Sequence, residues 1–144
     1  MNLIMIEKET GRIKFDKFTL FPRMELDDFF AGVDKDEIVS FSRNSNIELY
    51  LKPQKSKISF FIVRLFFECD NKRLKYVLLS AQDGDSIPSW DTWSRENELE
   101  RKVRNDVWLQ EELGVPPYKF TWGMLESVFD EKAASSYIWI SFLQ

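Results

Sequence analysis

Side chains that commonly perform catalysis are few in this chain of 144 residues, and the missing types exclude several reactions. The sequence contains no histidine, which excludes a Ser-His-Asp or Cys-His catalytic centre and an imidazole metal site. Cys69 is its one cysteine, so neither an internal disulfide nor a cysteine-rich zinc site can form. Because the Cys69 thiol has no histidine base, we interpret this residue as a small hydrophobic side chain. The five glycines are scattered and form no phosphate-binding loop.

Carboxylates are the most abundant reactive groups, with 24 Asp and Glu residues. Closely spaced pairs can serve acid–base hydrolysis or hold a divalent cation. Such pairs occur at Asp27/Asp28, Asp34/Asp36, Asp83/Asp85 and Glu111/Glu112. The pair at Asp83/Asp85 is the most metal-like, but the later Gly and terminal Glu of an EF-hand loop are missing. A carboxylate- or metal-dependent hydrolase that uses the acidic loop 83–98 is therefore an alternative hypothesis.

Two tryptophans three residues apart, Trp90 and Trp93, lie among acidic residues in a polar segment that precedes a predicted helix. Either ring can pack in the core under that helix. Trp is also enriched in interface hot spots, and an acidic rim around such a residue suits a basic partner. The partner-binding candidates in this segment are Asp83, Asp85, Trp90, Asp91, Trp93 and Glu96. A second candidate set, at the start of an earlier predicted helix, consists of Glu25, Asp27 and Asp28.

The net charge of −4 hides a segregation along the chain. Residues 1–42 hold 9 acidic and 6 basic residues (−3), residues 43–75 hold 3 and 8 (+5), and residues 76–144 hold 12 and 6 (−6). An acidic chain is poorly suited to nucleic acid, because affinity for phosphate comes from cations. It is better suited to a basic protein. We therefore predict a protein partner and no nucleic acid, while the basic segment leaves an RNA-associated accessory protein as a third hypothesis.

The elements in the first part of the chain are predicted to be hairpins and one short helix, within a single domain over residues 1–144. Leu26, Phe29 and Phe30 share one face of a helix predicted over Glu25–Ala31. Lys57–Glu68 has apolar residues on both faces, so we expect a central strand covered on both sides, with Leu74–Ala81 as its partner. Pro53 is expected to end the preceding strand, Ile47–Lys52.

A long helix and a final hairpin are predicted for the last part of the chain. The helix runs over Ser94–Leu113 with Ser94 as its N-cap and Gly114 at its C-terminal end. Its apolar stripe, expected to face the core, comprises Leu99, Val103, Val107 and Leu113, widened by Trp108 and Leu109. The hairpin pairs Phe120–Phe129 with Tyr137–Leu143, and Gly123 indicates a bulge or a close backbone approach. Local hairpins with two segregated helices predict an α+β fold with an antiparallel sheet built from hairpins.

The compartment is predicted from the same sequence. The first residues include an acid at position 7 and lack the apolar run of a secretory signal. The longest apolar stretches, Phe60–Val63 and Leu65–Phe67, are far shorter than the roughly 20 residues that span a bilayer. We therefore expect a cytoplasmic protein with no membrane partner, and we predict no cofactor and no metal.

The last third of the chain carries a recognisable pattern. Trp90-Asp91-Thr92-Trp93-Ser94 precedes a charged helix, and residues 105–120 read NDVWLQEELGVPPYKF. Trp122-Gly123, Ser127–Asp130 and Ser135-Ser136 follow, while Glu9–Ile13 and Met24–Phe29 match near the start. This pattern resembles a family of small bacterial immunity proteins of polymorphic toxin and contact-dependent growth inhibition systems.

The resemblance implies a non-enzymatic, cytoplasmic protein that binds one cognate toxin domain, often a basic nuclease, and blocks its active site or substrate path. It implies no catalytic residues. A more Gly-rich turn is expected in the family where this chain has Ala133-Ala134, so the terminal hairpin is expected to differ in shape.

Overall fold

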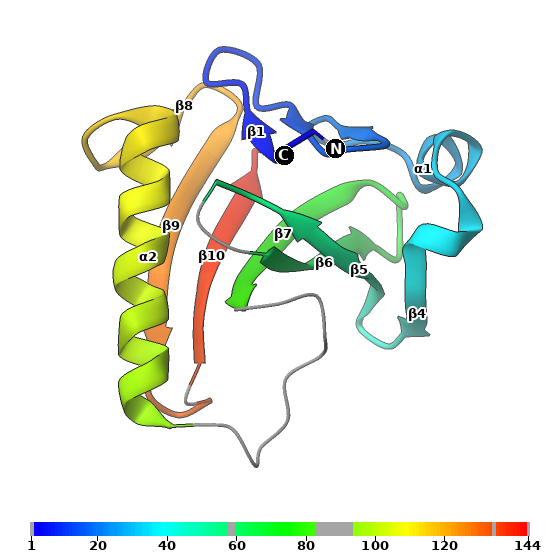
Figure 1. Ribbon diagram of the computed structural model, residues 1–144. Coiled ribbons are helices and arrows are strands. Elements are labelled where there is room, and N and C mark those ends of the chain that lie inside the picture. Colours follow the sequence, from blue (N-terminus) through cyan, green and yellow to red (C-terminus); the bar gives the residue numbers. More distant parts are fainter. Residues whose placement is uncertain (1, 58–59, 83–93, 134, 144) are drawn as a thin grey trace.

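A computed structural model describes residues 2–57, 60–82, 94–133 and 135–143 (Figure 1). Its main element is a seven-stranded antiparallel sheet in the order β4-β5-β6-β7-β10-β9-β8. The strands are β4 (Ile38–Arg43), β5 (Asn46–Lys55), β6 (Phe60–Glu68), β7 (Leu74–Gln82), β8 (Tyr118–Phe120), β9 (Gly123–Asp130) and β10 (Ser135–Phe142). A small sheet near the N-terminus consists of β1 (Met5–Ile6), β2 (Ile13–Lys14) and β3 (Thr19–Leu20).

Two α-helices and one short 3-10 helix complete the described fold. The helices are α1 (Leu26–Gly32), η1 (Lys35–Glu37) and α2 (Arg95–Leu113). Figure 1 shows α2 along β9 and β10, with α1 on the opposite side of the molecule near β4. The predicted α+β class is confirmed, with the short helix near the N-terminus and the long helix before the C-terminal hairpin.

The central pair of strands, β6 and β7, forms the predicted hairpin, but the sheet is covered less evenly than expected. The side chains of Phe61, Val63, Leu65 and Phe67 on one face of β6 are fully buried. Those on the other face, Phe60, Ile62, Arg64 and Phe66, are only half-buried. The face under α2 therefore contains the main core, while side chains of neighbouring strands shield the opposite face in part.

The strand β5 continues through Pro53 to Lys55, which corrects the prediction that it ends at Lys52. The pairing of β5 with β6 shifts register between Leu51 and Gln54. Proline has no N–H to donate to the ladder, so the chain accommodates it with a bulge and then resumes pairing.

Gly123 marks a close backbone approach, as the sequence predicts. It begins β9 opposite Phe142, after a turn that splits the predicted outgoing arm into β8 and β9. A Cβ atom at Gly123 would lie 2.1 Å from the Ser141 carbonyl oxygen, so a larger residue would push the two strands apart. The next turn, between β9 and β10, includes Ala134, which lies outside the described residues.

The N-terminal segment around Lys8 and Gly11 packs against the main sheet through contacts with Trp122. The Trp122 indole Nε1 donates a hydrogen bond to the Lys8 carbonyl oxygen at 2.8 Å. Gly11 has a positive φ of 78° and presses against the indole ring, where a Cβ atom would come within 2.4 Å of a ring carbon. In Figure 1 both chain ends lie at this side of the molecule.

Within the described ranges, no helix combines the length and apolar character needed to cross a bilayer.

Candidate functional site

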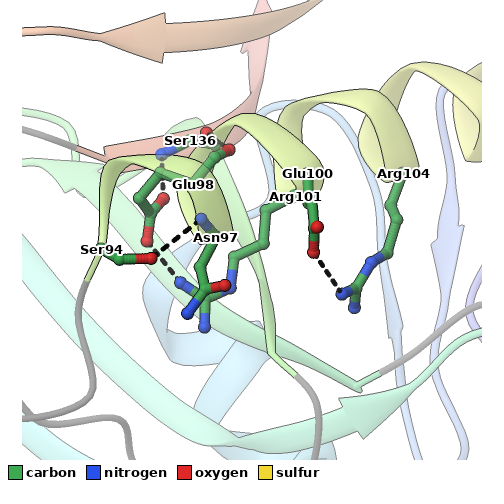
Figure 2. Close-up of polar contacts among 7 residues, drawn as sticks. All are labelled: Ser94, Asn97, Glu98, Glu100, Arg101, Arg104 and Ser136. Atoms are coloured by element: carbon green, nitrogen blue, oxygen red, sulfur yellow. Dashed lines mark hydrogen bonds and ion pairs between the residues drawn. The ribbon is translucent and has the colours of Figure 1, made fainter.

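The helix α2 begins and ends where the sequence predicts. The Ser94 side chain accepts a hydrogen bond from the Asn97 backbone N–H at 3.1 Å, and thereby caps the N-terminus (Figure 2). At the other end, the Gly114 N–H donates to the Gln110 carbonyl at 2.9 Å. Gly114 has a φ of 91°, a conformation that favours glycine and ends the helix.

The face that α2 turns to the core agrees only in part with the predicted apolar stripe, of which Trp108, Leu109 and Leu113 are buried. The apolar residues Leu99, Val103 and Val107, expected inside, are 41%, 61% and 44% exposed. The buried residues of the helix are Glu98, Asn105, Trp108, Leu109 and Leu113. An apolar stripe at i, i+4 and i+8 therefore points outward. We call Leu99, Val103 and Val107 the outer stripe.

The physical reason for this orientation is the size of Trp108. Its indole ring is fully buried and lies 5.1 Å, centroid to centroid, from the Phe61 ring on the buried face of β6. Burying Trp108 together with Leu109 and Leu113 removes a large apolar surface from water. Helical periodicity then turns Glu98 and Asn105 inward.

The inward Glu98 is accommodated by polar contacts at the start of α2. Its carboxylate accepts a hydrogen bond from the Ser136 backbone N–H at 2.8 Å and forms an ion pair with Arg101. The Ser136 hydroxyl donates to the Glu98 carbonyl oxygen. Figure 2 shows Glu98 pointing toward Ser136, while Glu100 and Arg104 pair with each other further along the helix. These contacts fix the rotation of α2 that exposes the outer stripe.

The charges on α2 leave its surface acidic. The helix has six acidic and four basic residues, a net charge of −2. Each of its four cations already has an ion-pair partner: Arg95 with Glu131, Arg101 with Glu98, Lys102 with Asp106 and Arg104 with Glu100. Glu96 and Glu111, by contrast, make no ion pair with the described residues. The carboxylates are thus the charges still available to a partner.

Glu96 is the member of the first candidate set that the structure describes. It precedes Leu99 by three residues and Val103 by seven, a spacing that puts it on the face of the outer stripe. A shallow depression of about 410 Å³ beside it is lined by Leu99, Glu100, Val103 and Arg104. Asp83, Asp85, Trp90, Asp91 and Trp93 lie outside the described residues.

The second candidate set occupies a different part of the surface. Glu25 precedes α1 and forms an ion pair with Arg73 at 3.0 Å, so its charge is already matched. Asp27 and Asp28 are exposed in the first turn of α1. Because α1 and α2 lie on opposite sides of the molecule (Figure 1), the structure does not bring Glu96 together with these acids.

The other chemically reactive residues have structural surroundings. Asp34 accepts a hydrogen bond from the Asp36 backbone N–H at 3.1 Å and so caps the short turn η1. Burial raises the pKa of Glu112, which is half-buried at the end of α2. The half-buried Cys69 thiol lies 3.5 Å from the Asn44 carbonyl oxygen. No group of three or more metal-ligating side chains occurs in the described ranges.

Cations of the basic segment 43–75 are partly matched by carboxylates and rings. The Arg64 guanidinium contacts Glu48 at 3.0 Å through Nε and stacks on the rings of Tyr50 and Phe66 at 4.9 and 5.2 Å. Such an arginine is held in the sheet by its neighbours, and its charge is shared with Glu48.

The outer stripe is the part of the predicted apolar stripe that was expected in the core and lies exposed instead. Its spacing is the same whether the stripe faces the core or solvent, so periodicity alone is ambiguous. The bulk of Trp108 and Leu109 on another face of the same helix was the available signal for which face is buried.

Comparison of the chain with family models, curated proteins and solved structures found no match.

Proposed function

We propose that this chain is a non-enzymatic immunity protein that binds a cognate toxin domain and neutralises it by occluding the toxin's active site. The outward face of α2 is the proposed binding surface. The observation that carries the proposal is the outer stripe itself, because three aliphatic side chains lie exposed on a helix face that no described element covers. Contiguous exposed apolar residues rimmed by polar ones are typical of protein interaction sites.

The energetic argument favours a protein partner over a small ligand. Fully burying a Val or Leu side chain contributes about 1.5–3 kcal/mol, so covering the outer stripe supplies the apolar centre of an interface. Charged residues surround this centre, as in the polar rim of known interfaces. The depression between Leu99 and Val103 is too shallow to enclose a small molecule but can accept a side chain of a partner.

The charge balance of α2 favours a basic partner. Its cations are held in ion pairs within this chain, whereas Glu96 lies next to the outer stripe without such a pair among the described residues. A cationic surface would therefore find matching carboxylates there, which accelerates encounter and orients the complex. A nuclease toxin has the required cations along its substrate path, because that path binds phosphates. The resemblance to bacterial immunity proteins supports the same partner class.

The proposal is tested by an experiment that measures both binding of a partner protein and protection of the cell from that partner's toxicity. The tagged chain is purified from its native host, and co-eluting proteins are identified by mass spectrometry. We expect a stoichiometric basic protein that is toxic when expressed alone and harmless when this chain is co-expressed. Recovery of the chain alone, from cells shown to express the neighbouring toxin candidate, would overturn the proposal.

A matched pair of variants tests the surface. Val103→Asp puts a charge at the centre of the outer stripe, while Val115→Asp makes the same change at an exposed valine beyond the helix end. We expect Val103→Asp to lose partner binding and protection and Val115→Asp to retain both. Equal effects of the two variants, or none from either, would contradict the use of α2.

A further inference from the structure

The strand β4 is an open edge of the main sheet. It pairs with β5 on one side, and no other described strand lies on its second side. All its residues from Val39 to Arg43 are exposed. The opposite end of the sheet is formed by β8, and α2 packs on the strands next to it, β9 and β10 (Figure 1). The edge at β4 is therefore well separated from the proposed binding surface.

The backbone of β4 has hydrogen-bonding groups directed away from the sheet. The Asn44 N–H donates to the Asn46 carbonyl at 3.0 Å, at the turn into β5. Hydrogen-bonded pairs alternate with non-hydrogen-bonded pairs along an antiparallel ladder. Ser42–Glu48 and Ser40–Tyr50 are then the bonded pairs, and the N–H groups of Phe41 and Arg43 point outward. These groups are free to bond to another strand.

The side chains of this edge do little to prevent such pairing. Val39 is 51% exposed and Phe41 is 53% exposed. Sheet edges are usually protected from association by charged residues, by proline or by cover from another element. Between Val39 and Ser42 this edge has no charged residue and no proline, and its protection is limited to an irregularity at Val39, where the register with β5 shifts between Ile38 and Ser40. An aromatic and an aliphatic side chain are instead presented beside open hydrogen-bonding groups.

The charges at the two ends of β4 complement each other in one orientation. The exposed acids Asp34 and Asp36 lie on either side of the exposed Lys35 just before the strand and leave this end with a net negative charge, and the exposed Arg43 ends the strand. Antiparallel pairing of two β4 strands places Arg43 of each copy toward the acidic end of the other. A parallel arrangement would place like charges together. The charge pattern therefore selects antiparallel self-pairing.

We infer that β4 pairs antiparallel with β4 of a second copy of this chain, around a twofold axis near Ser40. Phe41 then lies opposite Val39 of the other copy, and Arg43 lies next to its Asp36. The two main sheets then form one continuous sheet, and Phe41 and Val39 of both copies are covered at the junction. This inference goes beyond the proposed function and does not depend on it. Since β4 and β8 are opposite edges, the dimer leaves the outer stripe of each copy exposed and predicts two partners bound per dimer.

Self-association of the purified chain is the direct test. Sedimentation equilibrium and light scattering over a concentration series should give a mass approaching twice 17.2 kDa. Phe41→Lys should raise the dimer dissociation constant roughly tenfold or more, by adding charge to the edge. Phe30→Lys, at an exposed phenylalanine on α1, is the matched control and should leave the mass unchanged. A monomer at every concentration overturns the inference, as does a dimer that Phe41→Lys does not weaken.

Charge reversal supplies a second, independent measurement with substitutions at exposed side chains. Arg43→Glu and Asp36→Arg should each weaken the dimer, and the double variant should recover association because the complementary ends are exchanged. The thermal unfolding midpoint of each variant shows that it is folded. If the double variant is weaker than both single variants, antiparallel pairing through β4 is wrong. Toxin binding of the Phe41→Lys monomer should persist, which separates failure of this inference from failure of the proposed function.

Discussion

The carboxylate of Glu98 on α2 accepts a hydrogen bond from the backbone N–H of Ser136 on β10, at 2.8 Å. The Ser136 hydroxyl returns a hydrogen bond to the Glu98 carbonyl oxygen, and Arg101 neutralises the carboxylate. Both Glu98 and Ser136 are buried. This reciprocal pair joins the first turn of the long helix to the C-terminal hairpin and holds α2 in the rotation that the burial of Trp108 requires.

Removal of Glu98 should therefore destabilise the fold strongly. Glu98→Ala leaves the Ser136 N–H without its partner and Arg101 without its counter-charge, so we expect a loss of about 2–4 kcal/mol in the free energy of unfolding. Urea denaturation followed by Trp fluorescence measures this loss. Glu100→Ala, which removes an exposed ion pair with Arg104, should cost less than about 1 kcal/mol. Similar losses in the free energy of unfolding for both variants would show that the buried contacts of Glu98 stabilise the fold no more than an exposed ion pair does.

The contact between Gly11 and Trp122 predicts a second destabilising substitution. Gly11→Ala brings a Cβ atom into the indole ring at a backbone conformation with positive φ. We expect a loss of about 1–3 kcal/mol, through strain and displacement of the ring. Gly32→Ala is the matched control, because a Cβ atom there has no neighbour within 4 Å. Gly32→Ala should change the stability by at most about 1 kcal/mol, and in the stabilising direction, since Ala is the better helix former. A Gly11→Ala protein as stable as the parent would contradict the packing of the N-terminal hairpin on Trp122.

Local sequence signals predicted much of this fold. Turn residues and apolar runs predicted the hairpin of β6 and β7, and Ser94 and Gly114 predicted the ends of α2. These features depend on neighbouring residues, which is why a single sequence contains them. The strand order was not predicted, because the pairing of β7 with β10 joins residues about sixty positions apart.

The candidate site was predicted less well, for a reason that α2 illustrates. Both sides of the helix carry apolar residues, and the choice between them depends on whether Phe61 has room beside it for Trp108. The space beside Phe61 is determined by the packing of the sheet, and the sequence of the helix does not specify it. The sequence predicted Glu96 as a candidate contact residue from the neighbouring acids and tryptophans, and not from the outer stripe.

Glu112 predicts a pH dependence of stability. Burial raises its pKa above the ordinary value of 4.5, although the Ile6 backbone N–H and Lys57 oppose the shift. An acid with a raised folded-state pKa stabilises the fold below its unfolded pKa, and this contribution is lost as pH rises through the folded pKa. Glu112→Gln should therefore raise the thermal midpoint relative to the parent at pH 7 but not below pH 4.5.

The control for this pH effect is Glu96→Gln. Glu96 lies in the first turn of α2, where a negative charge interacts favourably with the helix dipole. Its removal should lower the midpoint slightly at pH 7, the opposite sign to Glu112→Gln. A Glu112→Gln difference that is the same at both pH values would mean that burial of the charge does not affect stability.

Charge reversal distinguishes the two candidate partner-binding sets. If the outward face of α2 meets a basic toxin, Glu96→Lys replaces attraction by repulsion beside the outer stripe. The association rate should fall about tenfold and depend less on salt, while the dissociation rate changes little, because rim charges act mainly on encounter. Asp27→Lys makes the same change in charge at the first turn of α1, on the far side of the molecule. Stopped-flow or surface-based kinetics at two salt concentrations measures both variants. Both substitutions alter the net charge equally, so only the one near the partner changes the local electrostatic field. Slower association with Asp27→Lys but not with Glu96→Lys would therefore show that the interface lies at α1.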